Sequence, residues 1–353
     1  MDSSISILPM NRFFKEDYDK SKYLQRDYRN KIVSYSPYLV NEVNICHKII
    51  QIPYYSNYFS VLEHYEKLNI SQFHEDIIDE LPDIYKNQYY LLQYDDKESH
   101  DLTDLLYNSK SIKKLIHDMI CSFQHILQSL IVLNDNELCY FHISPENFLF
   151  LKNYREKPVL SRFSLSLQIN QLDFYYISNM LSKIDNFTYL PPELHLLFYF
   201  MKQDIQTVSY SFIEEFSENF LENLPILRLF SGEYQTAYKH HCINSLKPYM
   251  NASKEQIISD ILERNNKWDV YGISVLFLQI FGCIFRVFSL KGTFIGEIVK
   301  SLSRNLHPDS SKRLTLRETL NMFHKCLDSQ TDWDFINNMD NHRLPQLFDE
   351  LQR

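Results

Sequence analysis

Residues 140–149, which read YFHISPENFL, are the segment whose side-chain types and spacing point most directly to chemistry. His142 is able to act as a general base near neutral pH, because the unperturbed pKa of an imidazole is about 6.5. The commoner role of such a histidine is to be packed or solvent-exposed within a turn. The segment therefore offers one candidate base, and the elements on either side of it must hold that base in place.

A helix precedes this segment and a hairpin follows it. From Ser111 to Leu133 apolar side chains recur at i, i+3, i+4 and i+7, which predicts an amphipathic helix, and the polar residues 134–136 end it. Two apolar runs, Phe148–Leu151 and Val159–Leu160, are separated by the polar turn Lys152–Lys157 and predict a β-hairpin. The segment thus lies in a loop between a helix and a hairpin.

The rest of the pattern predicts strands in the first half of the chain and mainly helices in the second. The first half contains a helix at Val40–Ile50 and strands at Tyr58–Leu62 and Gln88–Gln93. The second half contains helices at Ile213–Leu224, Glu255–Leu262, Trp268–Phe281 and Leu316–Leu327, the last opened by Thr315 with Glu318 three residues later. This order predicts an α+β fold with two lobes.

Residues 140–149 resemble the catalytic loop of protein kinases, which follows the pattern H-R-D-L-x-x-x-N between a helix and a hairpin. Four later segments resemble further kinase landmarks in the same order. They are residues 162–164 (RFS) in place of Asp-Phe-Gly, 189–193 (YLPPE) in place of Ala-Pro-Glu, 267–275 (KWDVYGISV) at the start of the central buried helix, and 307–315 (HPDSSKRLT) in place of Asp-Pro-x-x-Arg-x-Thr. The resemblance covers about residues 85–325.

The resemblance implies a bilobal protein-kinase-like fold, with a small strand-rich N-terminal lobe and a larger helical C-terminal lobe. The lobes are expected at residues 1–95 and 96–330, with a C-terminal tail at 331–353. An insertion at about residues 203–265 interrupts the C-terminal lobe. Together with the segments KWDVY and KRLT, this insertion is similar to what kinase-like proteins of large DNA viruses contain.

Most positions that would carry phosphoryl transfer hold other residue types here. By resemblance, His142 replaces the catalytic aspartate, Ser144 the loop lysine and Arg162 the Mg²⁺-binding aspartate. Mg²⁺ needs oxygen ligands, whereas a guanidinium is a cation without an acceptor, so Arg162 is expected to pair with an acid or a phosphate instead. Ser144 brings no positive charge to the transferred group. Asn147 is retained, as a metal ligand or, more simply, for a structural hydrogen bond.

The nucleotide-binding features of the first lobe are also weak. No glycine occurs before Gly232, so the glycine-rich loop that lets backbone approach the phosphates closely is absent from the sequence. Lys31 is the best-placed candidate for the nucleotide-binding lysine, and Glu42, in the expected helix, for its partner. The alternative is an ordinary surface lysine and glutamate.

Three other residues are structural by the same resemblance. Glu193 and Arg313 are expected to form a buried ion pair that ties the activation segment to the C-terminal lobe, and Asp269 to hydrogen-bond the backbone of the catalytic loop. Removing one partner of such a pair costs about 3–5 kcal/mol. These groups maintain a fold, whereas the replaced groups serve the chemistry.

Composition and charge argue against several classes of protein. The formal net charge of -9 argues against a general nucleic-acid binder. Six scattered cysteines without a CxxC pair favour reduced thiols in the cytoplasm over a disulfide framework or a zinc ribbon. The N-terminus shows no signal peptide, and the most apolar stretch, Val275–Leu290, is shorter than the roughly 20 residues that span a bilayer. We therefore expect a cytoplasmic protein without a membrane span, in the host cytoplasm or the virion if it is viral.

These features favour a pseudokinase, a binding or scaffold module that has a protein partner and needs no cofactor. The insertion and the tyrosine-rich N-terminal segment are the candidate contact regions. The alternative is an atypical active Ser/Thr kinase that uses ATP and Mg²⁺, with His142 as the base and the metal held by Asn147 and an acid such as Asp173. A third reading is another transferase on this fold that binds ATP in an unusual orientation.

Overall fold

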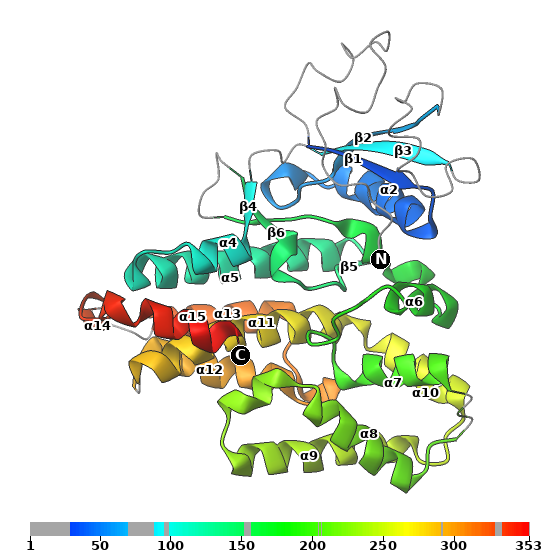
Figure 1. The fold of residues 1–353 in the computed structure, drawn as a ribbon. Coiled ribbons are helices and arrows are strands. Elements are labelled where there is room, and N and C mark those ends of the chain that lie inside the picture. Colours follow the sequence, from blue (N-terminus) through cyan, green and yellow to red (C-terminus); the bar gives the residue numbers. More distant parts are fainter. Residues whose placement is uncertain are drawn as a thin grey trace. The chain divides into compact units, whose positions relative to one another are not determined.

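The computed structural model describes residues 29–69, 88–94, 99–151, 157–203, 205, 207–290, 292–328 and 334–352. In these residues the chain is a mixed α+β protein in which helices predominate and the sheets are small and antiparallel (Figure 1). Its contacts divide it into two compact units. Unit 1 comprises Met1–Asp101 and Asn147–Ser166, and unit 2 comprises Leu102–Glu146 and Leu167–Arg353.

Unit 1 contains a three-stranded antiparallel sheet in the order β1-β3-β2, formed by Arg29–Ser34 (β1), Tyr89–Tyr94 (β3) and Leu62–Lys67 (β2). The central strand β3 confirms the prediction for residues 88–93, and most of its side chains are buried. The prediction of a strand at residues 58–62 was wrong, because residues 58–60 form hydrogen bonds with Leu160, which belongs to another sheet. Ser60 donates a backbone hydrogen bond of 2.8 Å to Leu160, and β2 begins only at Leu62.

Helix α2 (Pro37–Ile50) confirms the helix predicted at residues 40–50 and begins one turn earlier. The earlier start has a local cause. The Ser36 hydroxyl accepts a hydrogen bond from the Leu39 amide at 3.2 Å, and Pro37 occupies the first turn, where its missing amide hydrogen costs nothing. Ile45 and Ile49 lie on its fully buried face, and the helix contacts β2.

The predicted hairpin is present in unit 1 as β6 (Phe148–Leu151) and β7 (Val159–Leu160), with Phe148 opposite Leu160. Strand β4 (Ser99–Asp101) pairs with the other edge of β6 and completes the sheet β4-β6-β7. Residues 152–156 of the expected turn lie outside the described residues. A 3₁₀ turn at Phe163–Leu165 (η5) follows the hairpin and contacts α2.

Unit 2 is built from helices around α11 (Trp268–Phe288). Phe123 of α5 lies with its ring centroid 4.8 Å from that of Phe277 in α11 and 4.8 Å from that of Phe323 in α13, so the three helices share one core. The other described elements of unit 2 are α4 (Leu102–Tyr107), α5 (Ile112–Asp135), β5 (Leu138–Cys139), β8 (Leu167–Gln168), α6 (Phe174–Leu181), α7 (Pro192–Lys202), α8 (Tyr210–Glu222), α9 (Gly232–Leu246), α10 (Lys254–Glu263), α12 (Phe294–Ser303), α13 (Leu316–Asp328), α14 (Asp334–Asn337) and α15 (Leu344–Gln352).

The helices predicted for unit 2 are confirmed, with differences at their ends. Helix α13 begins with the reciprocal contacts expected between Thr315 and Glu318, whose backbone amides each bond the other side chain. Helix α11 continues past the predicted end at Phe281 to Phe288. The sequence did not predict α9, because its residues are mostly polar and show little apolar periodicity. Residues 203–265, which the resemblance marks as an insertion, contain α8, α9 and α10.

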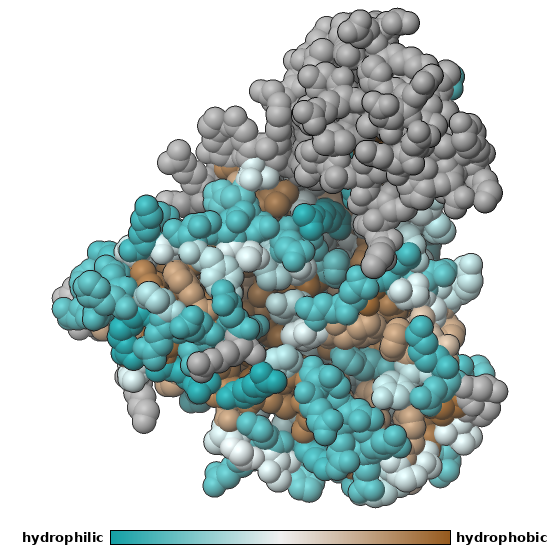
Figure 2. Space-filling model, in the orientation of Figure 1, coloured by the Kyte–Doolittle hydropathy of each residue, from teal (hydrophilic) through white to brown (hydrophobic). Residues whose placement is uncertain are grey.

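Two helical segments in the described part of the chain, residues 112–135 and 265–288, are long and apolar enough to cross a bilayer. Their most apolar windows are 72% and 83% buried, as expected of core helices in a folded unit. A membrane span is therefore not supported. On the face seen in Figure 2, hydrophilic side chains cover most of unit 2, and hydrophobic ones show mainly between them.

The described residues near the C-terminus belong to unit 2, although the sequence suggested a tail at 331–353. Helix α15 contacts α11 and buries Leu344 and Leu347, and Phe348 meets Tyr107 at 5.7 Å between ring centroids. At the other boundary, unit 1 includes Asn147–Ser166, which a linear division near residue 95 would assign to the second lobe.

Candidate functional site

The loop that begins at Tyr140 is held by one buried carboxylate. Asp269, in the first turn of α11, accepts backbone hydrogen bonds from Tyr140 at 2.8 Å and from Phe141 at 2.7 Å, as the sequence predicted. The His142 amide also bonds the Tyr140 carbonyl at 2.7 Å, and Phe141 has a positive φ of 67°. Together these make a γ-turn of the rarer, strained kind. The carboxylate thus keeps a strained turn in place.

The charge of Asp269 is stabilised by donors on this loop. Burial raises the pKa of Asp269 above its ordinary value, and hydrogen bonds from Phe141, Tyr140 and Cys139 act in the opposite direction. Burial of a carboxylate without such donors would lower the free energy of unfolding by roughly several kcal/mol, because the charge loses its hydration. The loop and the start of α11 therefore depend on each other.

Gly272, one turn into α11, lets this helix approach the loop closely. A β-carbon at this position would lie 2.8 Å from the Ile143 side chain and 2.8 Å from the Tyr189 carbonyl oxygen. Neither distance is tolerable, and the second involves backbone that cannot rotate away. The glycine thus brings the loop, α11 and the segment before α7 to one point.

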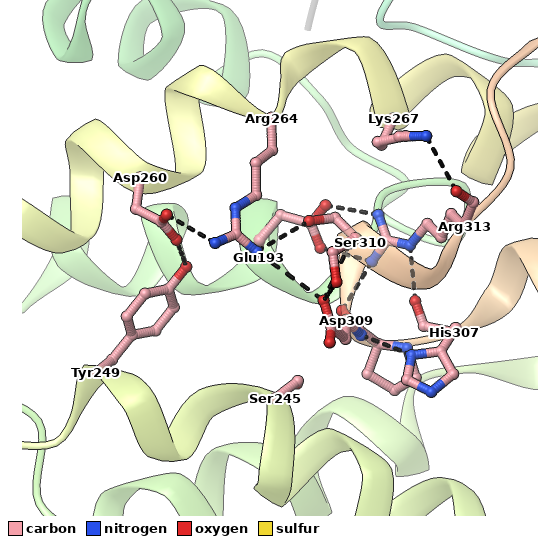
Figure 3. A network of polar contacts seen from close by, with 12 residues as sticks. Glu193, Ser245, Tyr249, Asp260, Arg264, Lys267, His307, Asp309, Ser310 and Arg313 are labelled. Atoms are coloured by element: carbon pink, nitrogen blue, oxygen red, sulfur yellow. Dashed lines mark hydrogen bonds and ion pairs between the residues drawn. The ribbon is translucent and has the colours of Figure 1, made fainter.

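The predicted ion pair between Glu193 and Arg313 is confirmed as a bidentate contact (Figure 3). Arg313 Nη1 and Nη2 donate to the two Glu193 carboxylate oxygens at 2.6 and 2.8 Å. The Arg313 side chain is 0% exposed and that of Glu193 9%, so each charge depends on the other. Burial disfavours the charged form of Arg313, but Glu193 outweighs this effect and raises the pKa of the guanidinium.

Two backbone carbonyls accept further hydrogen bonds from Arg313. Its Nε donates to the His307 carbonyl at 2.7 Å and its Nη2 to the Pro308 carbonyl at 2.9 Å. The guanidinium also lies 4.9 Å from the centroid of the Tyr271 ring, a cation–π distance. One buried arginine therefore fixes the start of α7 and the segment 307–313 against α11.

A second polar cluster links this segment to the insertion. Arg264, at the end of α10, donates hydrogen bonds to Asp260 at 2.7 Å and to Ser310 at 3.5 Å, and it lies 3.9 Å from Asp309 (Figure 3). Tyr249 donates a hydrogen bond to the other oxygen of Asp260. Nothing in the sequence predicted this cluster, because its members are far apart in the chain and follow no periodic pattern.

A small cavity lies within this network. Its volume of about 20 Å³ is enough for one water molecule, and Glu193, Ser245, Tyr249 and Arg264 are among the residues that line it. Residues 203–265 therefore contact Asp309 and Ser310 through Arg264, and they line the same cavity as Glu193.

The candidate chemical residues are divided between the two units. His142 and Ser144 belong to unit 2 and are half-buried. Asn147 belongs to unit 1, where its side chain is buried and its carbonyl accepts hydrogen bonds from the Ser161 amide and hydroxyl, both at 3.0 Å. The roles assigned to these residues by resemblance stay predictions.

Arg162, also in unit 1, is exposed and has a positive φ of 59°. A long side chain rarely takes this backbone conformation, so the surroundings must hold it. Part of that support is Asn41 of α2, whose amide group donates to the carbonyls of Ser164 at 2.9 Å and Ser166 at 2.8 Å. The sequence offered no signal for Asn41, because its partners lie more than 120 residues later.

Lys31 and Glu42 both lie in unit 1. Lys31 is on β1, opposite Leu92 of β3. Glu42 is buried on α2 and accepts a hydrogen bond of 3.0 Å from the hydroxyl of Tyr94. A pairing of Lys31 with Glu42 stays a prediction, and the sequence held no signal for Tyr94 as the partner of Glu42.

A magnesium site of the kinase kind would need acidic side chains held close together among the described residues. They contain no group of three or more His, Cys, Asp or Glu side chains able to hold a metal ion. Asp173, the acid considered for the kinase alternative, is exposed at the start of α6, where one oxygen accepts the Tyr176 amide at 2.7 Å. Helix capping accounts for an aspartate at this position.

Comparison with known proteins adds no family to these observations. No protein-family model matches the chain, and no curated protein matches its sequence. The motifs and the geometry around Asp269 and Arg313 therefore carry the functional argument.

Proposed function

We propose that this chain is a protein-kinase-like binding protein that has lost the groups for phosphoryl transfer. One observation carries the proposal. The buried groups that the motifs assign to maintenance of a kinase fold make the expected contacts, namely Asp269 with two loop amides and Glu193 with Arg313. The positions that the same motifs assign to chemistry hold His142, Ser144 and Arg162.

Electrostatics support the loss of transfer. Phosphoryl transfer depends on positioning and on cations that neutralise the phosphate oxygens, with Mg²⁺ held by carboxylates. Arg162 supplies a positive charge where a metal ligand would be needed, and Ser144 supplies none where a cation would stabilise the transferred group. Asn147 by itself is a poor magnesium site.

The insertion supports the binding role. Its α8 and α9 lie side by side within unit 2 (Figure 1), and Arg264 at the end of α10 ties it to the segment that carries Arg313. A surface fixed in this way loses little conformational entropy when a partner binds. We therefore assign the partner contact to α8 and α9.

Calorimetry with the full chain tests the proposal. ATP is titrated with and without Mg²⁺, and transfer of radiolabelled phosphate to the chain and to a generic protein substrate is measured in parallel. We expect no magnesium-dependent ATP binding and no incorporation of label. Incorporation that is abolished by Asn147→Ala and by His142→Ala would establish the active-kinase alternative instead. Asp349→Asn, on the exposed face of α15, serves as the variant without expected effect.

A further inference from the structure

Unit 2 contains an aromatic-walled cavity of about 420 Å³ between the segment before α7, helix α7 and helix α8. Five aromatic side chains line it: Phe187, Phe198, Tyr199, Phe216 and Phe220. Its volume lies in the range of pockets that hold small ligands or single side chains. It is separate from the contacts of Asp269 and Arg313.

The rings around this cavity contact one another and so hold a defined wall. Phe187 lies 4.7 Å from Phe198, and Tyr199 lies 5.4 Å from Phe216, between ring centroids. His195 connects the two sides, at 5.4 Å from Phe187 and 4.8 Å from Phe220. Contacts of this kind between rings are favourable and help to keep the wall in one arrangement.

The charge on the wall is negative. Among the described residues that line the cavity, Asp185 is the one with a formal charge at neutral pH, and it is exposed to solvent. Burial lowers the pKa of His195 to about 4, so its ring is neutral. The charged residues of α8 are glutamates that do not line the cavity, and one of them, Glu218, pairs with Lys239. Negative ring faces and a carboxylate repel anions and attract cations.

A cation already lies on one of these rings. The ammonium nitrogen of Lys202 is 5.2 Å from the centroid of the Phe198 ring, within the range of a cation–π contact. Lys202 is exposed and does not line the cavity. The chain itself therefore shows that Phe198 accepts an ammonium group.

We propose that this cavity binds a methylated lysine side chain of a partner protein. A methylated ammonium is bulky, weakly hydrated and positively charged, and therefore suits a wide aromatic wall with one carboxylate better than a compact, strongly hydrated ammonium does. A neutral apolar side chain would gain nothing from Asp185. The inference rests on the proposed binding role and names the chemistry of the partner.

A set of small probes tests the ligand class. Blocked trimethyl-lysine, blocked lysine, choline and the neutral tert-butyl isostere of trimethyl-lysine are titrated into the full chain by calorimetry. Trimethyl-lysine is expected to bind with a Kd of about 1 mM or below, and the neutral isostere about tenfold more weakly. Equal binding of the isostere, or no binding of trimethyl-lysine, overturns the proposal. Choline binding more tightly than trimethyl-lysine overturns the assignment to a protein side chain.

Variants locate the binding. Phe198 and Tyr199 are half-buried, so replacement by leucine keeps the fold while removing the ring, and each change is expected to weaken trimethyl-lysine binding about threefold to tenfold. Asp185→Asn is expected to weaken it by a similar factor. Tyr175→Leu is the matched control, because Tyr175 is 77% exposed on α6 and outside the cavity. Equal losses in Tyr175→Leu and Phe198→Leu overturn the proposal.

A substitution of Lys202 is expected to strengthen trimethyl-lysine binding instead of weakening it. Lys202→Met removes a competing cation and its repulsion, so trimethyl-lysine is expected to bind about twofold to fivefold more tightly. Weaker binding contradicts the proposal. The ATP titration and the transfer assay on the same samples separate the two proposals. If the chain transfers phosphate and also binds trimethyl-lysine, the proposed function is wrong and the methyl-lysine site stands. If it neither transfers phosphate nor binds trimethyl-lysine, only the methyl-lysine site is wrong.

Discussion

Two arginines singled out by the motifs, Arg313 of unit 2 and Arg162 of unit 1, differ in burial. Arg313 is 0% exposed and bonds a carboxylate and two carbonyls, whereas Arg162 of unit 1 is exposed. A buried charge cannot change without its partner, but an exposed residue can change type at little cost in stability. The identity of Arg313 is therefore tied to the stability of the fold, whereas that of Arg162 is much less constrained.

The largest expected effect comes from Arg313→Met. It leaves Glu193 buried without its cation and should lower the free energy of unfolding by about 3–5 kcal/mol, measured by urea denaturation at neutral pH. Arg317→Met is the matched control, because Arg317 is 65% exposed where it pairs with Asp135. The control should lose less than about 1 kcal/mol. Equal losses in the two variants would show that burial does not make the Arg313 ion pair more important for stability than an exposed one.

Asp269→Ala should have the next largest effect. It leaves the amides of Tyr140 and Phe141 without their acceptor and should cost about 2–4 kcal/mol, together with faster hydrogen exchange at both amides. Asp173→Ala is its control, since Asp173 also accepts a backbone amide but is exposed. That change should cost about 0.5–2 kcal/mol. Unchanged exchange at Phe141 in Asp269→Ala would show that the strained turn does not need the carboxylate.

Acid should destabilise the chain in part through His195. Burial lowers its pKa to about 4, below the value of about 6.5 in an unfolded chain, so the unfolded state binds the proton more readily. Its contribution is complete above pH 6.5 and is lost as the pH falls toward 4, by about 2–3 kcal/mol. His195→Gln should flatten the stability profile in this window. Parallel profiles for the two proteins would contradict the assignment.

The smallest effect is expected at Arg162. Because this side chain is exposed, Arg162→Asp should change the free energy of unfolding by less than about 0.5 kcal/mol. Its neighbour Phe163 is 1% exposed, and Phe163→Ala should cost about 3–5 kcal/mol in the same denaturation experiment. A large loss of stability in Arg162→Asp would show that Arg162 stabilises the fold, as Arg313 is expected to do.

Local patterns predicted the elements whose burial follows a period. The helix at residues 112–135 and the hairpin of β6 and β7 could be read from apolar spacing, and the start of α13 from Thr315 and Glu318. Prediction failed where other parts of the chain decide the local structure. Residues 58–60 pair with Leu160, and α9 has too few apolar residues to show a helical stripe.

The site could be predicted in part for a similar reason. Glu193, Asp269 and Arg313 were identified because motifs mark them. Asn41 and Arg264 were missed, although each joins segments that are distant in the chain, because a single polar residue leaves no periodic signal.

The sequence alone determined which groups are available: most of the helices and the hairpin, a histidine at position 142, a cation at Arg162 and a formal net charge of -9. Only the tertiary structure decided which of these groups share a local environment. It buries Arg313 on Glu193, sets Asp269 against two loop amides and gathers five aromatic rings around one cavity. The physical reason is that burial and hydrogen bonding depend on contacts between distant residues, which local spacing does not encode.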